Sequence, residues 1–135
     1  MVNSSANNAH IIRLIMPIFL VKKLQKHPLT KGLYALSLGH SKREDSFKVT
    51  QSGGEQHVLF YCQSGHATLT INQKISTIKR GDIVIISPGQ DFYYQAKKQS
   101  GHQAYWINFT GSLAKDFAER LLMKMDDGIA HVGIL

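Results

Sequence analysis

The chain has 135 residues, of which 43% are apolar and 19% charged, and these totals are typical of one globular domain. Sixteen Lys and Arg against nine Asp and Glu give a net charge of +7, but the basic residues are scattered rather than gathered into one patch. This pattern favours a solvated surface over direct nucleic-acid binding by this chain. Cys62 is the only cysteine, which excludes an internal disulfide and fits a cytoplasmic protein with a buried, inert thiol.

The N-terminal part, residues 1–26, is interpreted as an arm that is partly disordered. Residues 1–9 are small and polar, which is typical of a disordered terminus. The apolar run "IIRLIMPIFLV" over 11–21 is shorter than the about 20 residues that span a bilayer, and Arg13 and Pro17 interrupt it. Its lysines follow the apolar run instead of preceding it, unlike a signal peptide. We therefore expect an arm or a short strand here, and no membrane partner.

From residue 33 the chain is predicted to form strands, because short runs of β-forming residues alternate with turn residues. The segment 40–45, "HSKRED", is expected to be a loop, and 52–55, "SGGE", a turn. The expected strands lie at 33–38, 46–51, 57–63, 67–73, 74–80, within 81–89, at 91–96 and at 103–111. The pattern predicts a mainly β fold, an antiparallel sandwich or small barrel.

An amphipathic helix is expected after the strands. Apolar residues recur every four positions at Leu113, Phe117, Leu121 and Met125. Ser112 is placed to cap the helix start, Asp116 and Arg120 are placed to pair, and 126–128 is placed to end the helix. The apolar stripe has two interpretations that both stay open: packing onto the sheet, and contact with a second copy of the chain.

No pattern for metal binding or catalysis stands out. Two His one residue apart on a strand could grip one ion, but the sequence has no His-x-His. Nor does it have a nucleophile-elbow pattern or a phosphate-binding loop. We expect no metal, no cofactor and no catalytic residues.

The strand "AYWINFTG", 104–111, has two different faces. Trp106 and Asn108 point to one side, and Tyr105, Ile107 and Phe109 to the other. If the strand that contains Tyr94 pairs nearby, an indole, a phenol and an amide would form a floor on which a small polar ligand such as a sugar could stack. The alternative, that these aromatic residues belong to the core, stays open.

Four segments in this order resemble one known family. They are "HPLTKGLYALSLGH" (27–40), "HVLFYCQSGHATLTINQ" (57–73), "IKRGDIVIISPGQDFYY" (78–94) and "YWINFTG" (105–111). Together they resemble the N-terminal ligand-binding and dimerisation domain of AraC-type transcription regulators. The resemblance implies a cupin-like barrel over 27–111 and a helical dimerisation segment over 112–135, truncated here. It also implies that a helix-turn-helix DNA-binding domain belongs C-terminal to this chain and is absent from it.

The resemblance also implies a ligand site. The arabinose-binding member stacks its sugar on the residue that corresponds to Trp106, and a Tyr in the position of Tyr94 also matches. Ser64 stands where that member has an arginine, Asn108 stands where the family pattern has a histidine, and Ser41 corresponds loosely to a threonine. The expected ligand-binding residues are therefore Trp106, Tyr94, Asn108, Ser64 and Ser41. The family arginine and histidine are strong polar anchors, and both are absent here. We therefore expect a less charged ligand than those residues would hold.

The resemblance leads to one principal hypothesis and leaves two alternatives. The principal one is the effector-sensing and dimerisation domain of a transcription regulator, which binds a sugar-like molecule and controls an attached DNA-binding domain. The alternatives are a metal-dependent cupin enzyme and a structural dimerisation module whose barrel is filled by its own side chains.

Overall fold

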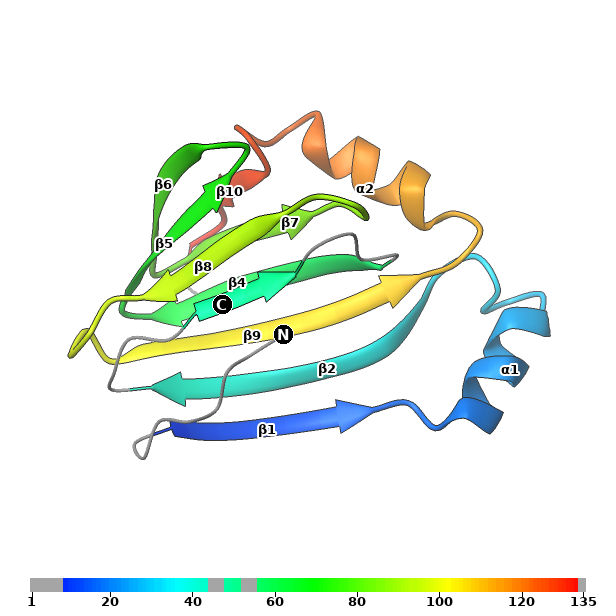
Figure 1. The fold of residues 1–135 in the computed structure, drawn as a ribbon. Helices are drawn as coiled ribbons and strands as arrows, with labels where there is room; N and C mark the ends of the chain where they lie inside the picture. The colour runs from blue at the N-terminus through cyan, green and yellow to red at the C-terminus, as the bar shows by residue number, and fades with distance from the viewer. Residues whose placement is uncertain (1–8, 44–47, 52–55, 134–135) are drawn as a thin grey trace.

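The computed structural model describes residues 9–43, 48–51 and 56–133, and within them the chain forms ten strands and two helices (Figure 1). In chain order they are β1 (Ala9–Ile15), α1 (Ile18–Lys26), β2 (Tyr34–Arg43), β3 (Lys48–Gln51), β4 (His57–Ser64), β5 (His66–Ile71), β6 (Lys74–Lys79), β7 (Asp82–Ile86), β8 (Phe92–Ala96), β9 (His102–Thr110), α2 (Ala114–Leu122) and β10 (Ile129–His131).

The strands form two antiparallel sheets. One sheet has the order β1-β2-β9-β4-β7-β10, and the other has the order β3-β8-β5-β6. In the view of Figure 1, β1 and β2 lie at the lower edge of the larger sheet, away from β5, β6 and β8. The predicted antiparallel β architecture is confirmed.

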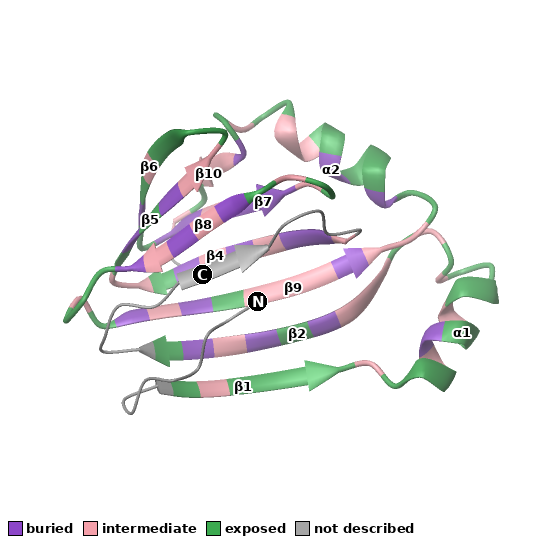
Figure 2. Ribbon diagram, in the orientation of Figure 1, coloured by how far each residue is buried: buried purple, intermediate pink, exposed green. Residues whose placement is uncertain are grey.

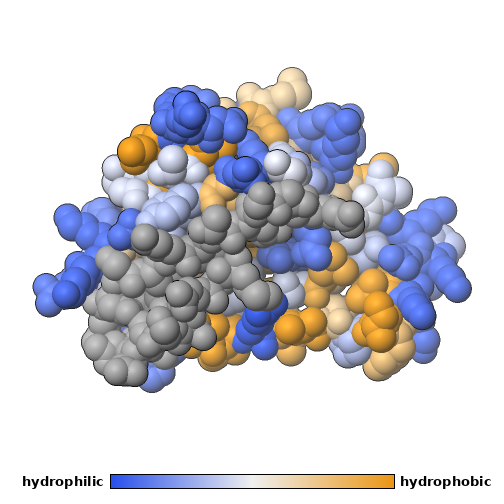
Figure 3. Space-filling model, in the orientation of Figure 1, coloured by the Kyte–Doolittle hydropathy of each residue, from blue (hydrophilic) through white to orange (hydrophobic). Residues whose placement is uncertain are grey.

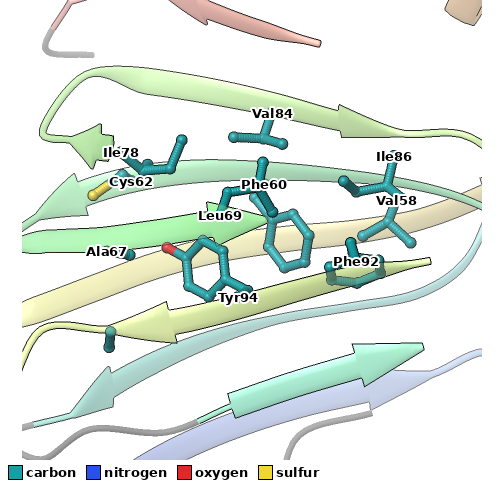
Figure 4. Close-up of a cluster of buried hydrophobic side chains, with 11 residues drawn as sticks. Val58, Phe60, Cys62, Ala67, Leu69, Ile78, Val84, Ile86, Phe92 and Tyr94 are labelled. Atoms are coloured by element: carbon teal, nitrogen blue, oxygen red, sulfur yellow. The ribbon is translucent and has the colours of Figure 1, made fainter. Parts of the chain in front are cut away.

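The core lies between the two sheets and is built from alternate residues of the facing strands, as the two-residue period of a strand requires. Phe60 of β4 and Tyr94 of β8 stack with ring centroids 5.3 Å apart (Figure 4). Around them pack the buried residues Val58, Cys62, Ala67, Leu69, Ile78, Val84, Ile86, Phe92 and Ala96. Cys62 is buried as predicted, and burial raises the pKa of its thiol to about 11, so the thiol is protonated at neutral pH.

The β5–β6 connection is a two-residue hairpin turn. Asn72 and Gln73 both have positive φ angles, 51° and 67°, which is the geometry of a type I′ turn. Asn tolerates this region better than most residues because its short polar side chain bonds locally. This turn sets the register in which Ile71 pairs with Lys74.

The N-terminal part contains more regular structure than the sequence indicated. β1 pairs with β2 along its whole length, from Ala9 opposite Arg43 to Ile15 opposite Ser37. Pro17 then stands at the N-cap of α1, where its missing N–H costs no hydrogen bond. Figure 2 shows that most of β1 and α1 is exposed. The prediction of disorder for 1–9 falls on residues 1–8 outside the described part, whereas Ala9 already belongs to β1.

Three predicted boundaries are wrong: the end of β2 and both ends of α2. The expected loop at 40–45 is strand up to Arg43, because β2 is paired on one side by β1 and on the other by β9. The helix α2 begins at Ala114 after Leu113 at its N-cap, and no side chain caps it, so Ser112 does not have the predicted capping role. The helix ends at Leu122, which leaves Met125 outside it, and 129–131 form β10, a strand that the sequence did not predict.

The pairing of Asp116 with Arg120 is confirmed, with Oδ2 and Nε 3.0 Å apart. Neither of the two helices in the described residues has the length and apolar character to cross a membrane.

Candidate functional site

β9 divides its side chains between the two faces of the larger sheet as predicted. Trp106 lies directly opposite Phe60 on β4 and Gly39 on β2. Residues opposite each other in an antiparallel pair project to the same face, and Phe60 belongs to the core between the sheets. Trp106 is thus on the inner face, half-buried against the core, whereas Phe109 faces outward and meets Phe117 of α2 edge to face at 5.8 Å.

The Trp106 indole lies across β2 because the residue beneath it is a glycine. A Cβ atom placed on Gly39 would come within 2.4 Å of the indole atoms Cη2 and Cζ2, and within 2.6 Å of the Ile12 carbonyl oxygen on β1. Both distances are far below a van der Waals contact. The absence of a side chain at Gly39 therefore allows the ring to occupy the space over this strand, next to β1.

Polar side chains stand beside this indole on the same face. Asn108 follows two positions along β9, and its Nδ2 donates a hydrogen bond to Oε1 of Gln56 at 3.1 Å. Asn108 is half-buried and lies opposite Ser37 on β2, which is buried. Ser41 is 3% exposed and lies two residues from Gly39, about 7 Å along the strand. The structure therefore places three of the five predicted ligand residues, Trp106, Asn108 and Ser41, on the same inner face, with Asn108 and Ser41 on opposite sides of the indole along the strands.

Tyr94 is placed differently. It is 2% exposed, stacks on Phe60, and its hydroxyl is hydrogen-bonded to Nε2 of His102 at 2.5 Å. Burial raises the pKa of Tyr94 well above its usual value. The packing makes Tyr94 a core residue, and a direct contact with a ligand stays a prediction. Its partner His102, fully buried at the start of β9, was not singled out in the sequence because a lone histidine carries no pattern.

Ser64 lies apart from the other predicted residues. It follows an irregularity in the β4–β9 pairing, four residues and about 13 Å along β4 from Phe60. Its hydroxyl donates a hydrogen bond to the Gly101 carbonyl at 2.7 Å, so it holds the connection that leads into β9. The structure does not bring Ser64 to the inner-face group.

Comparison with known proteins decides the family. The family model described as the AraC-like ligand binding domain matches residues 35–128. The chain belongs to this family. The AraC-like domain is 29% identical over 110 residues to the MmsAB operon regulatory protein of Pseudomonas aeruginosa, which covers 78% of this chain and 36% of that protein. It is 27% identical over 82 residues to the Msm operon regulatory protein of Streptococcus mutans, 61% of this chain and 30% of that protein. The chain thus spans about a third of these relatives.

Solved structures show that the AraC-like domain has the cupin barrel fold. A cupin domain of Cnp3 from Schizosaccharomyces pombe has a TM-score of 0.56 at 13% identity, covering 84% of this chain and 74% of that one. A cupin 2 conserved barrel domain protein from Leptotrichia buccalis scores 0.55 at 15% identity, covering 82% and 44%. A variant of oxalate decarboxylase from Bacillus subtilis also scores 0.55 at 15%, covering 82% and 28%. At these identities the likeness concerns the fold alone.

The predicted dimerisation residues of the AraC-like domain are only partly covered by its own sheet. Helix α2 buries Ala114 and Ala118, while Leu113 is 60% and Phe117 39% exposed. Leu121 and Met125 are half-buried. The helix therefore packs with one face and presents apolar side chains on another.

A cavity of about 390 Å³ is lined by residues of β5, β6, β7, α2 and β10. It is lined by Leu69 and Ile129 and by the residues of an ion pair, Lys74 and Asp127. The hydrogen bond to Asp127 raises the pKa of Lys74. In the part of the chain that the structure describes, no three His, Cys, Asp or Glu side chains gather as they would around a metal ion.

Proposed function

We propose that this chain is the effector-sensing domain of a cytoplasmic transcription regulator and binds a small molecule on the inner face of β2 and β9. The observation that carries the proposal is the half-buried Trp106 indole over Gly39, beside the amide of Asn108 and the hydroxyl of Ser41. The family and the matched operon regulators support a regulatory role rather than a catalytic one.

A sugar-like molecule suits such a surface. The C–H faces of a sugar ring pack on an aromatic face, and hydroxyl and amide groups fix its orientation through hydrogen bonds. Asn108 is held by Gln56, so its amide is oriented before any ligand arrives. Pre-ordered groups lose less entropy on binding.

When the effector binds, this domain would control DNA binding by a helix-turn-helix domain in another part of the regulator. The ligand must bind one arrangement of the regulator better than the other, because only a difference in affinity shifts an equilibrium. The N-terminal arm, which includes β1 beside Gly39, is the element that the ligand would reorganise. The regulator would act as a homodimer through Leu113, Phe117, Leu121 and Met125.

The test uses Trp106, the only tryptophan of the chain. The purified domain is titrated with a panel of sugars, sugar acids and small aromatic acids, and a saturable change in fluorescence identifies a bound compound. Calorimetry then compares Trp106→Ala with Tyr105→Ala, an outward-facing neighbour on the same strand. We expect Trp106→Ala to weaken binding by about tenfold or more through loss of the stacking surface, and Tyr105→Ala to leave it unchanged.

Circular dichroism is used to check that both variants fold. The proposal fails if no compound produces a saturable change, or if Trp106→Ala binds with the same affinity as the unchanged protein.

A further inference from the structure

Strand β1 places a basic residue beside the Trp106 site. Arg13 lies directly opposite Gly39 on β2, and Gly39 lies opposite Trp106 on β9. Since residues paired in this way share a face, Arg13 belongs to the inner face, one strand beyond the glycine that the indole covers. The indole edge is close to β1, because the same Cβ position on Gly39 that meets the ring also meets the Ile12 carbonyl.

Arg13 has no counter-charge from the described part of the chain. The ion pairs there are Lys74–Asp127, Lys115–Glu119, Arg120–Asp116 and His131–Asp82. The four neighbouring strands β1, β2, β9 and β4 contain no Asp or Glu at all. An exposed guanidinium therefore stands at the rim of a sheet face that carries hydroxyls, amides and an indole but no carboxylate.

Along β1, the neighbours of Arg13 on this face are apolar. Ile11 and Ile15 flank it two positions away on the same side of β1, and Ile15 is largely exposed. Figure 3 shows hydrophobic surface along the lower edge, where β1 lies, interrupted by a hydrophilic patch. Because Arg13 is exposed, its guanidinium is accessible to an anion in solution, and the flanking isoleucines offer apolar surface beside it.

We propose that the effector is a small organic carboxylate, whose acid group is held by Arg13 while its body lies against Trp106. The inference rests on the function proposed above and specifies the ligand class of the same site. The planar guanidinium offers two parallel N–H donors that match the two oxygens of one carboxylate.

A carboxylate fits this site better than a phosphate does. A single guanidinium balances the single negative charge of a carboxylate and pairs with both of its oxygens. The sequence alone favoured a less charged ligand, because Ser64 replaces the family arginine. The strand register changes that expectation, since it places an arginine from a different segment on the same face, one strand beyond the glycine that the indole covers.

The experiment compares acids with their neutral counterparts. D-galacturonate is paired with D-galactose, and benzoate with benzamide, and binding is followed by Trp106 fluorescence and calorimetry. We expect at least one acid to bind at least about tenfold more tightly than its neutral partner. Arg13→Gln should weaken binding of that acid about tenfold to one hundredfold, the range for a charged hydrogen bond. Arg13→Lys keeps the positive charge but not the paired N–H donors, so it should lose less affinity for the acid than Arg13→Gln does.

Arg80→Gln is the matched control, because it removes one positive charge from the exposed turn before β7. It should bind the acid as the unchanged protein does, and unaltered thermal midpoints should show that the variants fold. Equal binding of the acid and neutral partners, or an unchanged affinity in Arg13→Gln, would overturn the carboxylate inference while leaving the proposed function intact. If none of the four compounds binds, the carboxylate inference is wrong, and the wider panel decides the proposed function separately.

Discussion

The position of the Trp106 side chain depends on Gly39, which has no side chain. In the antiparallel pair of β2 and β9, the residue opposite a large ring normally fills the adjoining space, and here that residue is Gly39. The indole occupies the vacant position and reaches toward β1. A glycine in a strand interior weakens the strand, and one common reason to retain it is close approach of another group.

Gly39→Ala is expected to displace the indole. The added methyl group would lie 2.4 Å from the ring and 2.6 Å from the Ile12 carbonyl, so both the ring and β1 must move. We expect a loss of about 1–3 kcal/mol of stability, as for other overpacked sites, and a shift of the Trp106 emission to longer wavelength. Urea unfolding and fluorescence spectra measure both effects. Ser41→Ala, on the same face of β2, should leave the emission maximum in place, and an unshifted Gly39→Ala spectrum would contradict the packing described for Trp106.

Tyr94 shows why residue type alone does not identify a binding group. The sequence placed it after a Pro-Gly turn, near a tryptophan on a neighbouring strand, and both a ligand contact and a core position were open. The structure buries its ring between Phe60 and the edge of His102. Its hydroxyl is satisfied by the His102 imidazole, as a buried polar group must be.

At the scale of elements, the sequence pattern predicted one of the two helices and not the other. The repeat of apolar residues every four positions predicted α2, although its buried face turned out to be Ala114 and Ala118. Helix α1 was not predicted, because its first residues, 18–21, belong to the apolar run 11–21, which was read as an arm or a short strand. The apolar side chains of Leu113 and Phe117 remain for contact outside the domain.

Leu113→Glu tests whether this surface joins two copies. A charge buried at an apolar contact without a partner is costly, so the dimer dissociation constant should rise by at least about tenfold. Sedimentation at a series of concentrations measures it. Met123→Glu is the control, because Met123 is 85% exposed and lies outside the stripe. A protein that stays monomeric at every concentration, or a Leu113→Glu variant that associates as before, would rule out the predicted interface.

At the scale of the whole molecule, stability depends on the two sheets closing over one core, and buried ionisable groups link that stability to pH. His57 is buried at the start of β4 and stacks on Phe109, with ring centroids 5.1 Å apart. Burial lowers the pKa of His57 below its ordinary value of 6.5. The unfolded chain therefore binds a proton at His57 more readily than the folded chain does. The stabilising contribution of the neutral, buried imidazole is complete above pH 6.5 and decreases as the pH falls toward the pKa of the folded state.

The predicted consequence is a loss of stability in mild acid that His57→Phe reduces. Urea unfolding at about pH 7.5 and about pH 5.5 gives the difference for each protein. The phenylalanine keeps a ring against Phe109 but has no proton to bind. His66→Phe, which changes an exposed histidine, should retain the full difference. An equal pH difference in the His57→Phe protein would show that this imidazole does not contribute.

The sequence by itself determined the fold class, most strands, the helix α2 and the division of β9 into an inner and an outer face. These features depend on local periodicity and on turn residues, which neighbouring positions carry. It also contained the family resemblance that the comparison confirmed.

Only the tertiary structure decided which distant residues meet. The register places Ser41 on the same face as Trp106 and Asn108, whereas Ser64 lies apart from them. It also places Arg13 on this face, from a segment that the sequence analysis interpreted as an arm. The short β10 forms because β7 offers it an open edge, not because three residues have a strand preference of their own. Register and edge pairing depend on contacts between segments far apart in the chain, and no local pattern contains that information.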